Sequence, residues 1–144
     1  MKLRNLLGDR GASAVEFAVI APVLILLVLG IIEASLMFNA QITLTNAARE
    51  GARYSAVHAT ETVANIQTRT VAAATMALVT SPVTTANVSV TFTDAADAAS
   101  TATSCPGGGY VTVRVDYQYK FLLTRFVGGA TVPLAGKAKM QCGG

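Results

Sequence analysis

One carboxylate, that of Glu16, stands directly before an apolar run. The run covers residues 17–32 and contains no charged or polar side chain. A charged side chain at the centre of a bilayer costs about 3 kcal/mol or more, and such groups are usually paired. The Gly11-Ala12 junction lies shortly before this carboxylate. The chemical question at this end of the chain is therefore what neutralises Glu16.

The chain also contains two cysteines, Cys105 and Cys142, whose thiols could react with each other. Both follow the apolar run, on the side that export would place in an oxidising compartment. They form no Cys-x-x-Cys motif for redox exchange and no ligand set for zinc. A structural disulfide between them is predicted, which would close the 36 intervening residues. It would stabilise the fold by about 4 kcal/mol on the chain-entropy model.

No catalytic constellation is recognisable in the rest of the sequence. The only histidine, His58, lies in a polar turn and is expected to be solvent-exposed. The stretch GGATVPLAGKA has six residues between Gly129 and Gly136, whereas a phosphate-binding loop requires four. The later acidic residues show no pairing that suggests general acid and base roles: Glu50, Glu61, Asp94, Asp97 and Asp116. We therefore expect no enzyme, no cofactor and no metal site.

The elements that carry these residues begin with a membrane helix. As a helix, residues 12–32 would reach about 31 Å, close to a hydrocarbon core of about 30 Å. Lys2, Arg4 and Arg10 precede it, so the N-terminus should stay in the cytoplasm and the remainder should be exported. A net charge of +3 on scattered residues gives no support for nucleic acid binding. A cleaved secretory signal is the alternative, but EASLMFNAQ after Ile32 offers a poor cleavage site.

The helical pattern continues beyond the apolar run. Small and apolar residues recur at steps of three and four up to Gly51, with polar residues largely on other faces. One helix is therefore predicted over residues 12–56, spanning the membrane at about 12–33. The residues that carry the pattern are Met37, Ala40, Leu44, Ala47 and Gly51.

Two motifs in this helix resemble a known family. Gly11 and Ala12, with Glu16 the fifth residue after the glycine and Phe17 the sixth, resemble the processing site of prepilins. The segment GIIEASLMFNAQITLTNAAREGARYSAV is similar to TadE-like proteins, the pseudopilins or minor pilins of tight adherence (Flp) pili. The family signature corresponds to the Asn-Ala-Ala-Arg-Glu-Gly-Ala-Arg element, residues 46–53. The close resemblance covers about residues 8–57.

This resemblance implies a leader, residues 1–11, that a prepilin peptidase removes between Gly11 and Ala12. Glycine is the least obstructive residue for backbone that must enter a protease site. The cut would leave a new ammonium group on Ala12, with which Glu16 could pair in a neighbouring subunit or within its own helix. In the alternative, Glu16 snorkels unpaired to the headgroup boundary.

After the long helix the sequence predicts an exported α+β domain, residues 57–144. A second helix should run from Thr62 through Leu78 and stop at Ser81-Pro82. Period-two alternation predicts strands at 88–93, 111–121 and 134–142, with a small-residue loop at 94–109 that is mobile or surface-exposed. The fold class is therefore α+β: a long transmembrane helix, a second helix and an antiparallel sheet of three or four strands.

The resemblance implies a non-enzymatic subunit or assembly factor of tight adherence pili in the inner membrane, its C-terminal domain periplasmic or extracellular. Its implied partners are the prepilin peptidase, other pseudopilins, the major pilin and the pilus assembly machinery. Arg49, Glu50 and Arg53 could bond within their helix, contact another subunit, or form only a solvated face. A second hypothesis is an unprocessed, single-pass anchored binding or scaffold domain. The third, an anchored enzyme, lacks a supporting constellation.

Overall fold

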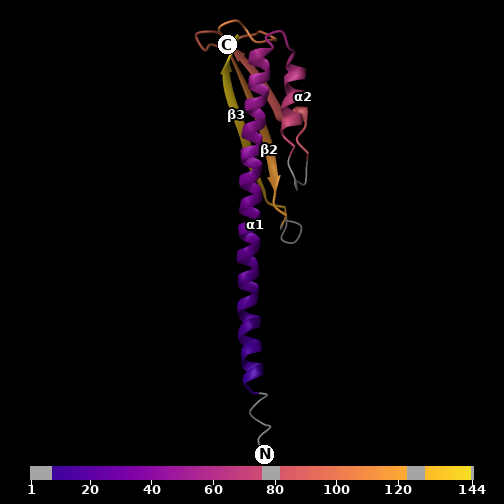
Figure 1. The fold of residues 1–144 in the computed structure, drawn as a ribbon, viewed down its shortest axis with the longest axis vertical. Coiled ribbons are helices and arrows are strands. Elements are labelled where there is room, and N and C mark those ends of the chain that lie inside the picture. Colours follow the sequence, from indigo (N-terminus) through magenta and orange to yellow (C-terminus); the bar gives the residue numbers. More distant parts are fainter. Residues whose placement is uncertain (1–7, 76–81, 123–128, 144) are drawn as a thin grey trace, which may run out of the picture. The chain divides into compact units, whose positions relative to one another are not determined.

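The chain forms two helices, a short 3-10 turn and one sheet in a computed structural model that describes residues 8–75, 82–122 and 129–143 (Figure 1). The α+β fold predicted from the sequence is confirmed. The chain divides into two compact units, residues 1–36 and 37–144, which we describe separately. The elements in chain order are α1 (Gly8–Val57), α2 (Val63–Ala73), η1 (Thr85–Asn87), β1 (Val88–Thr93), β2 (Tyr110–Lys120) and β3 (Thr131–Gln141).

Unit 1 contains the first half of α1. Its large apolar side chains are exposed, with Phe17 at 70% and Leu26 at 66% of their accessible surface. A helix that is apolar all round belongs either in a protein core or in a bilayer. By length and composition, α1 contains a segment able to cross a membrane, and none of that segment is buried within the protein.

Unit 2 is built on a three-stranded antiparallel sheet in the order β1-β2-β3. Val113 of β2 lies opposite Val90 of β1 and Ala138 of β3. Along β2 every second residue is buried, and Val111, Val113 and Val115 are fully inaccessible to solvent. The alternation in the sequence therefore identified the face of the sheet that forms the core.

The second half of α1 packs on this core face through small residues. Its buried apolar side chains are Ala40, Leu44, Ala47, Ala48 and Ala52, and the Ser55 side chain is buried as well. At Gly136 of β3, an added Cβ atom would collide with the backbone of Leu44 and Thr45. Nearby, the Gln41 Nε2 donates to the Ala135 carbonyl oxygen at 2.9 Å. A strand and a helix are thus in direct backbone contact.

Helix α2 begins where predicted and ends earlier. Thr62 caps its N-terminus by accepting a hydrogen bond from the Asn65 backbone N–H. Ile66 and Thr70 are buried, and Gly51 of α1 leaves the space that the Thr70 side chain occupies. The prediction that this helix continues through Leu78 is wrong, because the helix ends before Ala74. The Ala74 N–H is shared between two carbonyl oxygens, as at a helix end.

The second helix ends before Ala74 because the ψ of this residue is 20°, outside the α-helical range. The Ala74 side chain is itself buried. The predicted positions Ala77, Leu78 and the Ser81 stop lie outside the described residues.

The predicted strand boundaries are confirmed for β1, shift by one residue for β2, and fail at the start of β3. That strand begins at Thr131, three residues before the predicted Leu134, and includes Pro133. Proline lacks the N–H that a central strand needs, but β3 is an edge strand and tolerates it. Pro133 lies opposite Gln118. Because β2 continues to Lys120, the pairing of the two strands continues past Pro133 to Thr131.

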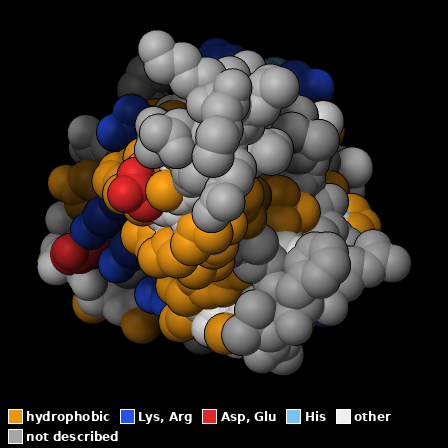
Figure 2. All heavy atoms as spheres, turned by 90° about the horizontal axis from the view of Figure 1, so that it is seen from below, with side chains coloured by type: hydrophobic (Ala, Val, Ile, Leu, Met, Phe, Trp, Pro, Cys, Tyr) orange, Lys and Arg blue, Asp and Glu red, His pale blue; other side chains and the backbone are white. Residues whose placement is uncertain are grey.

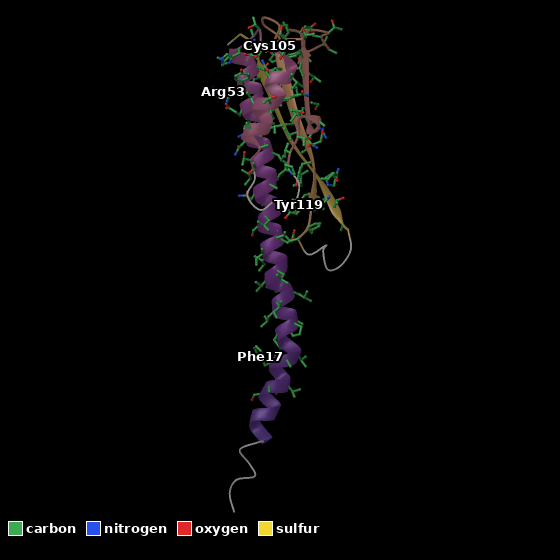
Figure 3. All side chains as sticks on the ribbon, turned by 90° about the vertical axis from the view of Figure 1, so that its right-hand side faces the viewer. Phe17, Arg53, Cys105 and Tyr119 are labelled. Atoms are coloured by element: carbon green, nitrogen blue, oxygen red, sulfur yellow. A yellow bond between two sulfur atoms is a disulfide. The ribbon has the colours of Figure 1, made fainter. Side chains whose placement is uncertain are left out.

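Cys105 and Cys142 form a disulfide, as the sequence predicts, with Cα atoms 5.5 Å apart. Figure 3 labels Cys105. Both cysteines are buried. The Cys142 N–H donates to the Gly109 carbonyl oxygen at 2.8 Å, and the Gly143 N–H donates to the Ala56 carbonyl oxygen at 3.3 Å. The disulfide and these bonds fasten the C-terminus to the loop before β2 and to the end of α1.

Replacing Gly136 by alanine should destabilise unit 2, because the new Cβ meets helix backbone that cannot move without disturbing α1. Overpacking of this kind costs about 1–3 kcal/mol. Gly107→Ala is the matched control, since nothing lies within 4 Å of a Cβ added there. The thermal midpoint of the detergent-solubilised chain should fall for Gly136→Ala alone. Equal midpoints for the two variants would contradict the close approach.

Candidate functional site

The Gly11-Ala12 junction lies inside α1, within the first turn after Gly8. Gly11, Ala12 and Glu16 are all exposed, and a Cβ added at Gly11 would meet nothing within 4 Å. Ala12 and Glu16 are four residues apart, so they occupy the same face of the helix. Glu16 forms no ion pair within the part of the chain that the structure describes.

The surface around Glu16 is apolar. Figure 2 shows hydrophobic side chains gathered over the middle of the face that is seen from below. Val15 and Phe17 flank the carboxylate and are 65% and 70% exposed. The exposed carboxylate of Glu16 thus lies within an apolar helix surface, an arrangement that favours lipid or another helix as its surroundings.

Arg49, Glu50 and Arg53 lie on the outward face of α1 in unit 2, where Arg53 is seen in Figure 3. The Arg53 Nη2 and Nε atoms donate to the two Glu50 carboxylate oxygens at 2.9 and 3.0 Å. These hydrogen bonds lower the pKa of Glu50 and raise that of Arg53. The bond within the helix is therefore present, while Arg49 is exposed. An exposed pair of this kind contributes little to stability.

A group of polar side chains that we call the Tyr54 cluster joins the end of α1 to α2. The Tyr54 hydroxyl donates to Glu61 Oε1 at 3.1 Å, and Asn65 Nδ2 donates to Glu61 Oε2 at 2.6 Å. The Arg69 guanidinium carbon lies 5.2 Å from the centre of the Tyr54 ring. The centre of the His58 ring lies 4.6 Å from the centre of the Tyr54 ring. One aromatic ring thus organises the turn between the two helices.

The two acceptor bonds of Glu61 determine its electrostatics. Hydrogen bonds from Asn65 first and Tyr54 second lower the pKa of the Glu61 carboxyl. The bond to Glu61 raises the pKa of the Tyr54 hydroxyl. Both shifts favour the ionised carboxylate and the protonated phenol, which is the combination that the cluster needs at neutral pH.

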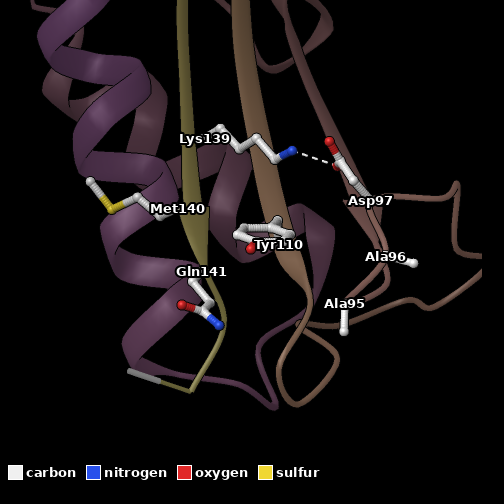
Figure 4. A pocket seen from close by; sticks show the side chains of 7 residues that line it. All are labelled: Ala95, Ala96, Asp97, Tyr110, Lys139, Met140 and Gln141. Carbon is white, nitrogen blue, oxygen red and sulfur yellow. Dashed lines mark hydrogen bonds and ion pairs between the residues drawn. The ribbon is translucent and has the colours of Figure 1, made fainter.

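A recess of about 450 Å³ is lined by the loop after β1, by Tyr110 at the start of β2 and by the last residues of β3 (Figure 4). Lys139 forms an ion pair with Asp97 and lies 4.6 Å above the Tyr110 ring. Asp97 has a φ of 65°, a left-handed conformation that aspartate tolerates. The ion pair lowers the pKa of Asp97, with Lys139 as the main cause. The ion pair between Asp97 and Lys139 therefore connects the surface loop after β1 to the sheet.

Among the described residues, no three His, Cys, Asp or Glu side chains come together to hold a metal ion. His58 is exposed as predicted, but its ring packs on Tyr54, and its Nδ1 lies 3.1 Å from the Tyr54 carbonyl oxygen.

Sequence reasoning missed the Tyr54 cluster and the contact between Asp97 and Lys139. The four-residue spacings of Tyr54 with His58 and of Glu61 with Asn65 were signals that could have been read. The meeting of Tyr54 with Arg69 depends on how the turn folds α2 back. Asp97 and Lys139 are 42 residues apart, and only the strand register brings them together.

Residues 11–53 match the model of a protein family described as TadE-like protein. The match confirms the resemblance seen in the sequence. It begins at Gly11, ends at Arg53 and lies within α1, so it does not extend to α2 or to the sheet. No curated protein and no solved structure matches the chain.

The Tyr54 cluster predicts a specific acid sensitivity. Because the pKa of folded Glu61 lies below its ordinary value of 4.5, its stabilisation is complete above that pH and is lost as the pH falls through the folded value. Thermal midpoints should therefore decline less steeply with acid in Glu61→Gln than in the natural chain. Tyr54→Phe keeps the ring and should remove part of the same dependence. Parallel curves of midpoint against pH for all three proteins would refute this role.

Proposed function

We propose that the chain is a TadE-like pseudopilin or minor pilin that acts in the assembly of tight adherence (Flp) pili. The observation that carries the proposal is the family match over residues 11–53, which starts at the candidate cleavage glycine and ends at Arg53. The exposed apolar surface of unit 1 supports membrane residence before assembly. In this role the protein is not an enzyme and needs no cofactor.

The proposed topology places the N-terminus in the cytoplasm and unit 2 in the periplasm or outside the cell. Lys2, Arg4 and Arg10 precede the apolar run, and cytoplasmic flanks of membrane helices are enriched in such residues. The disulfide between Cys105 and Cys142 fits an oxidising compartment. The inner membrane is then the site from which the subunit enters assembly.

A prepilin peptidase would cut this subunit between Gly11 and Ala12, releasing residues 1–11. Gly11 offers no side chain to obstruct a protease, and the junction lies close to the first residue of α1. Helix ends open at low cost, so the backbone there can become extended in a protease site. The mature chain would consist of the long helix, residues 12–56, and the exported domain, residues 57–144.

The new ammonium group of Ala12 would pair with Glu16 of a neighbouring subunit. A paired carboxylate costs less in lipid than an isolated one, so pairing favours association of the helices. Other pseudopilins, the major pilin and the assembly machinery are the proposed partners. Arg49, Glu50 and Arg53 would then offer polar contacts on the part of α1 beyond the membrane.

The alternative is an unprocessed, membrane-anchored binding or scaffold domain. The folded core of unit 2 and the apolar helix favour it equally, because neither requires cleavage. The N-terminus of the membrane-extracted protein separates the two functions.

Gly11→Val should block processing, because a branched side chain would obstruct the protease site. Intact-mass spectrometry of the natural chain should give an N-terminus at Ala12, and of Gly11→Val an N-terminus at Met1. Gly30→Val is the matched control, since it adds the same side chain to an exposed helical glycine and should be cut normally. A natural chain that retains Met1 would refute the pseudopilin mechanism and support the anchored domain.

Glu16→Ala should leave cleavage largely intact and impair association with partner subunits. The measured quantities are the processed fraction, the co-purification of pseudopilins and the number of pili. Val15→Ala alters the neighbouring position, which is also exposed, without removing charge and should behave as the natural chain. Normal co-purification and piliation with Glu16→Ala would refute charge pairing.

A further inference from the structure

The end of unit 2 at which the chain enters is apolar on its surface. Phe38 and Ile42, one turn apart on α1, are 68% and 57% exposed. Leu122, the second residue after the end of β2, is 43% exposed. We call the side chains of Phe38, Ile42 and Leu122 the apolar end. Among the described residues of unit 2, the other large exposed apolar side chain is Val57, at the opposite end of α1.

Contacts along β3 show that Leu122 belongs to the same end as Phe38. The far end of the strand bonds to α1 near its last residue, Gly143 to Ala56, whereas Ala135 bonds to Gln41. The strand therefore approaches the start of unit 2 as its residue numbers fall. Thr131 lies five residues before Gly136, about 16 Å further in that direction.

Met37, the first residue of unit 2, lies seven residues before Leu44, about 10 Å along the helix. The strand from Gly136 to Thr131, counted from the contact of Gly136 with Leu44, is therefore long enough to reach the level of Met37. The partner of Thr131 across the sheet is Lys120 of β2, and Phe121 and Leu122 follow. The residues after Lys120 thus extend to the end of unit 2 that the membrane segment joins.

The number of helical residues between the membrane segment and Phe38 indicates how far Phe38 lies from the hydrocarbon layer. If the hydrocarbon layer ends near Glu33, five helical residues place Phe38 about 7 Å beyond it. The polar headgroup layer is roughly 5–8 Å thick on each side of a bilayer. Phe38 therefore falls within the headgroup layer, where exposed apolar side chains can bury against acyl chains.

We propose that the apolar end of unit 2 is seated on the bilayer, with Phe38 and Leu122 in contact with lipid. Lys120 is exposed beside them and would extend its amine to lipid phosphates while its stem lies along the apolar surface. The proposal rests on the membrane anchorage in the proposed function and adds a second, separate contact. The seat would restrict the tilt and rotation of the exported unit until the subunit leaves the membrane.

The absence of tryptophan from the chain allows a direct test. Single variants Leu122→Trp, Phe38→Trp, Ile25→Trp and Val57→Trp each carry one emitting residue. Each full chain is reconstituted into phosphatidylcholine vesicles with a minor fraction of phosphatidylglycerol, with and without bromine on the acyl chains. Ile25 reports on the membrane segment, and Val57 is the matched exposed control at the far end of α1.

We expect Leu122→Trp and Phe38→Trp to emit at shorter wavelength and to lose roughly half their intensity on brominated lipid, as for side chains buried about 5–10 Å into the interface. Val57→Trp should be unaffected. If Ile25→Trp is quenched but Leu122→Trp and Phe38→Trp are not, the seat is refuted and the anchor stands. Blue-shifted emission without quenching would show a protein cover, such as a second copy, and would also refute it. If Ile25→Trp is not quenched, the anchorage itself fails.

Discussion

The contact of β3 with the backbone of α1 at Gly136 determines how unit 2 is arranged. Any side chain at this position would collide with Leu44 and Thr45, so the strand and the helix could not approach so closely. Two hydrogen bonds, from Gly143 to Ala56 and from Gln41 to Ala135, show the direction in which β3 runs along α1. The sheet register then carries that direction to β2 and β1.

Close packing is achieved at the expense of buried apolar area. The α1 face toward the core consists mainly of alanines, and alanine buries little surface compared with leucine or phenylalanine. The larger contributions come from the valines and aromatic residues of the sheet. Backbone hydrogen bonds at Gly109 and Ala56, together with the disulfide, then hold the C-terminus in place. A small unit with an alanine-rich helix face relies more than usual on such local connections.

Local sequence patterns predicted the elements, and long-range geometry explains what they missed. Alternation located β1 residue by residue and showed the buried face of β2, because period two depends only on the strand itself. The early start of β3 could not be predicted, since pairing with β2 carries the strand through Pro133. The Tyr54 cluster was missed because the turn after Val57 sets the distance from Tyr54 to Arg69. The cysteine pairing was readable because two cysteines allow a single bridge.

The two units differ in how their charged side chains are paired. In unit 2 the ion pairs Arg53–Glu50, Arg114–Asp116 and Lys139–Asp97 are formed within the chain and face water. Charges in water have little to gain from another subunit, so this surface provides weak electrostatic drive for association. Glu16 is different, because its neighbours on α1 are apolar and the described residues offer it no cation. If the apolar helix lies in lipid, the free energy available from neutralising a charge is concentrated at the N-terminal helix. Subunit recognition through unit 2 would then depend on shape and apolar contact.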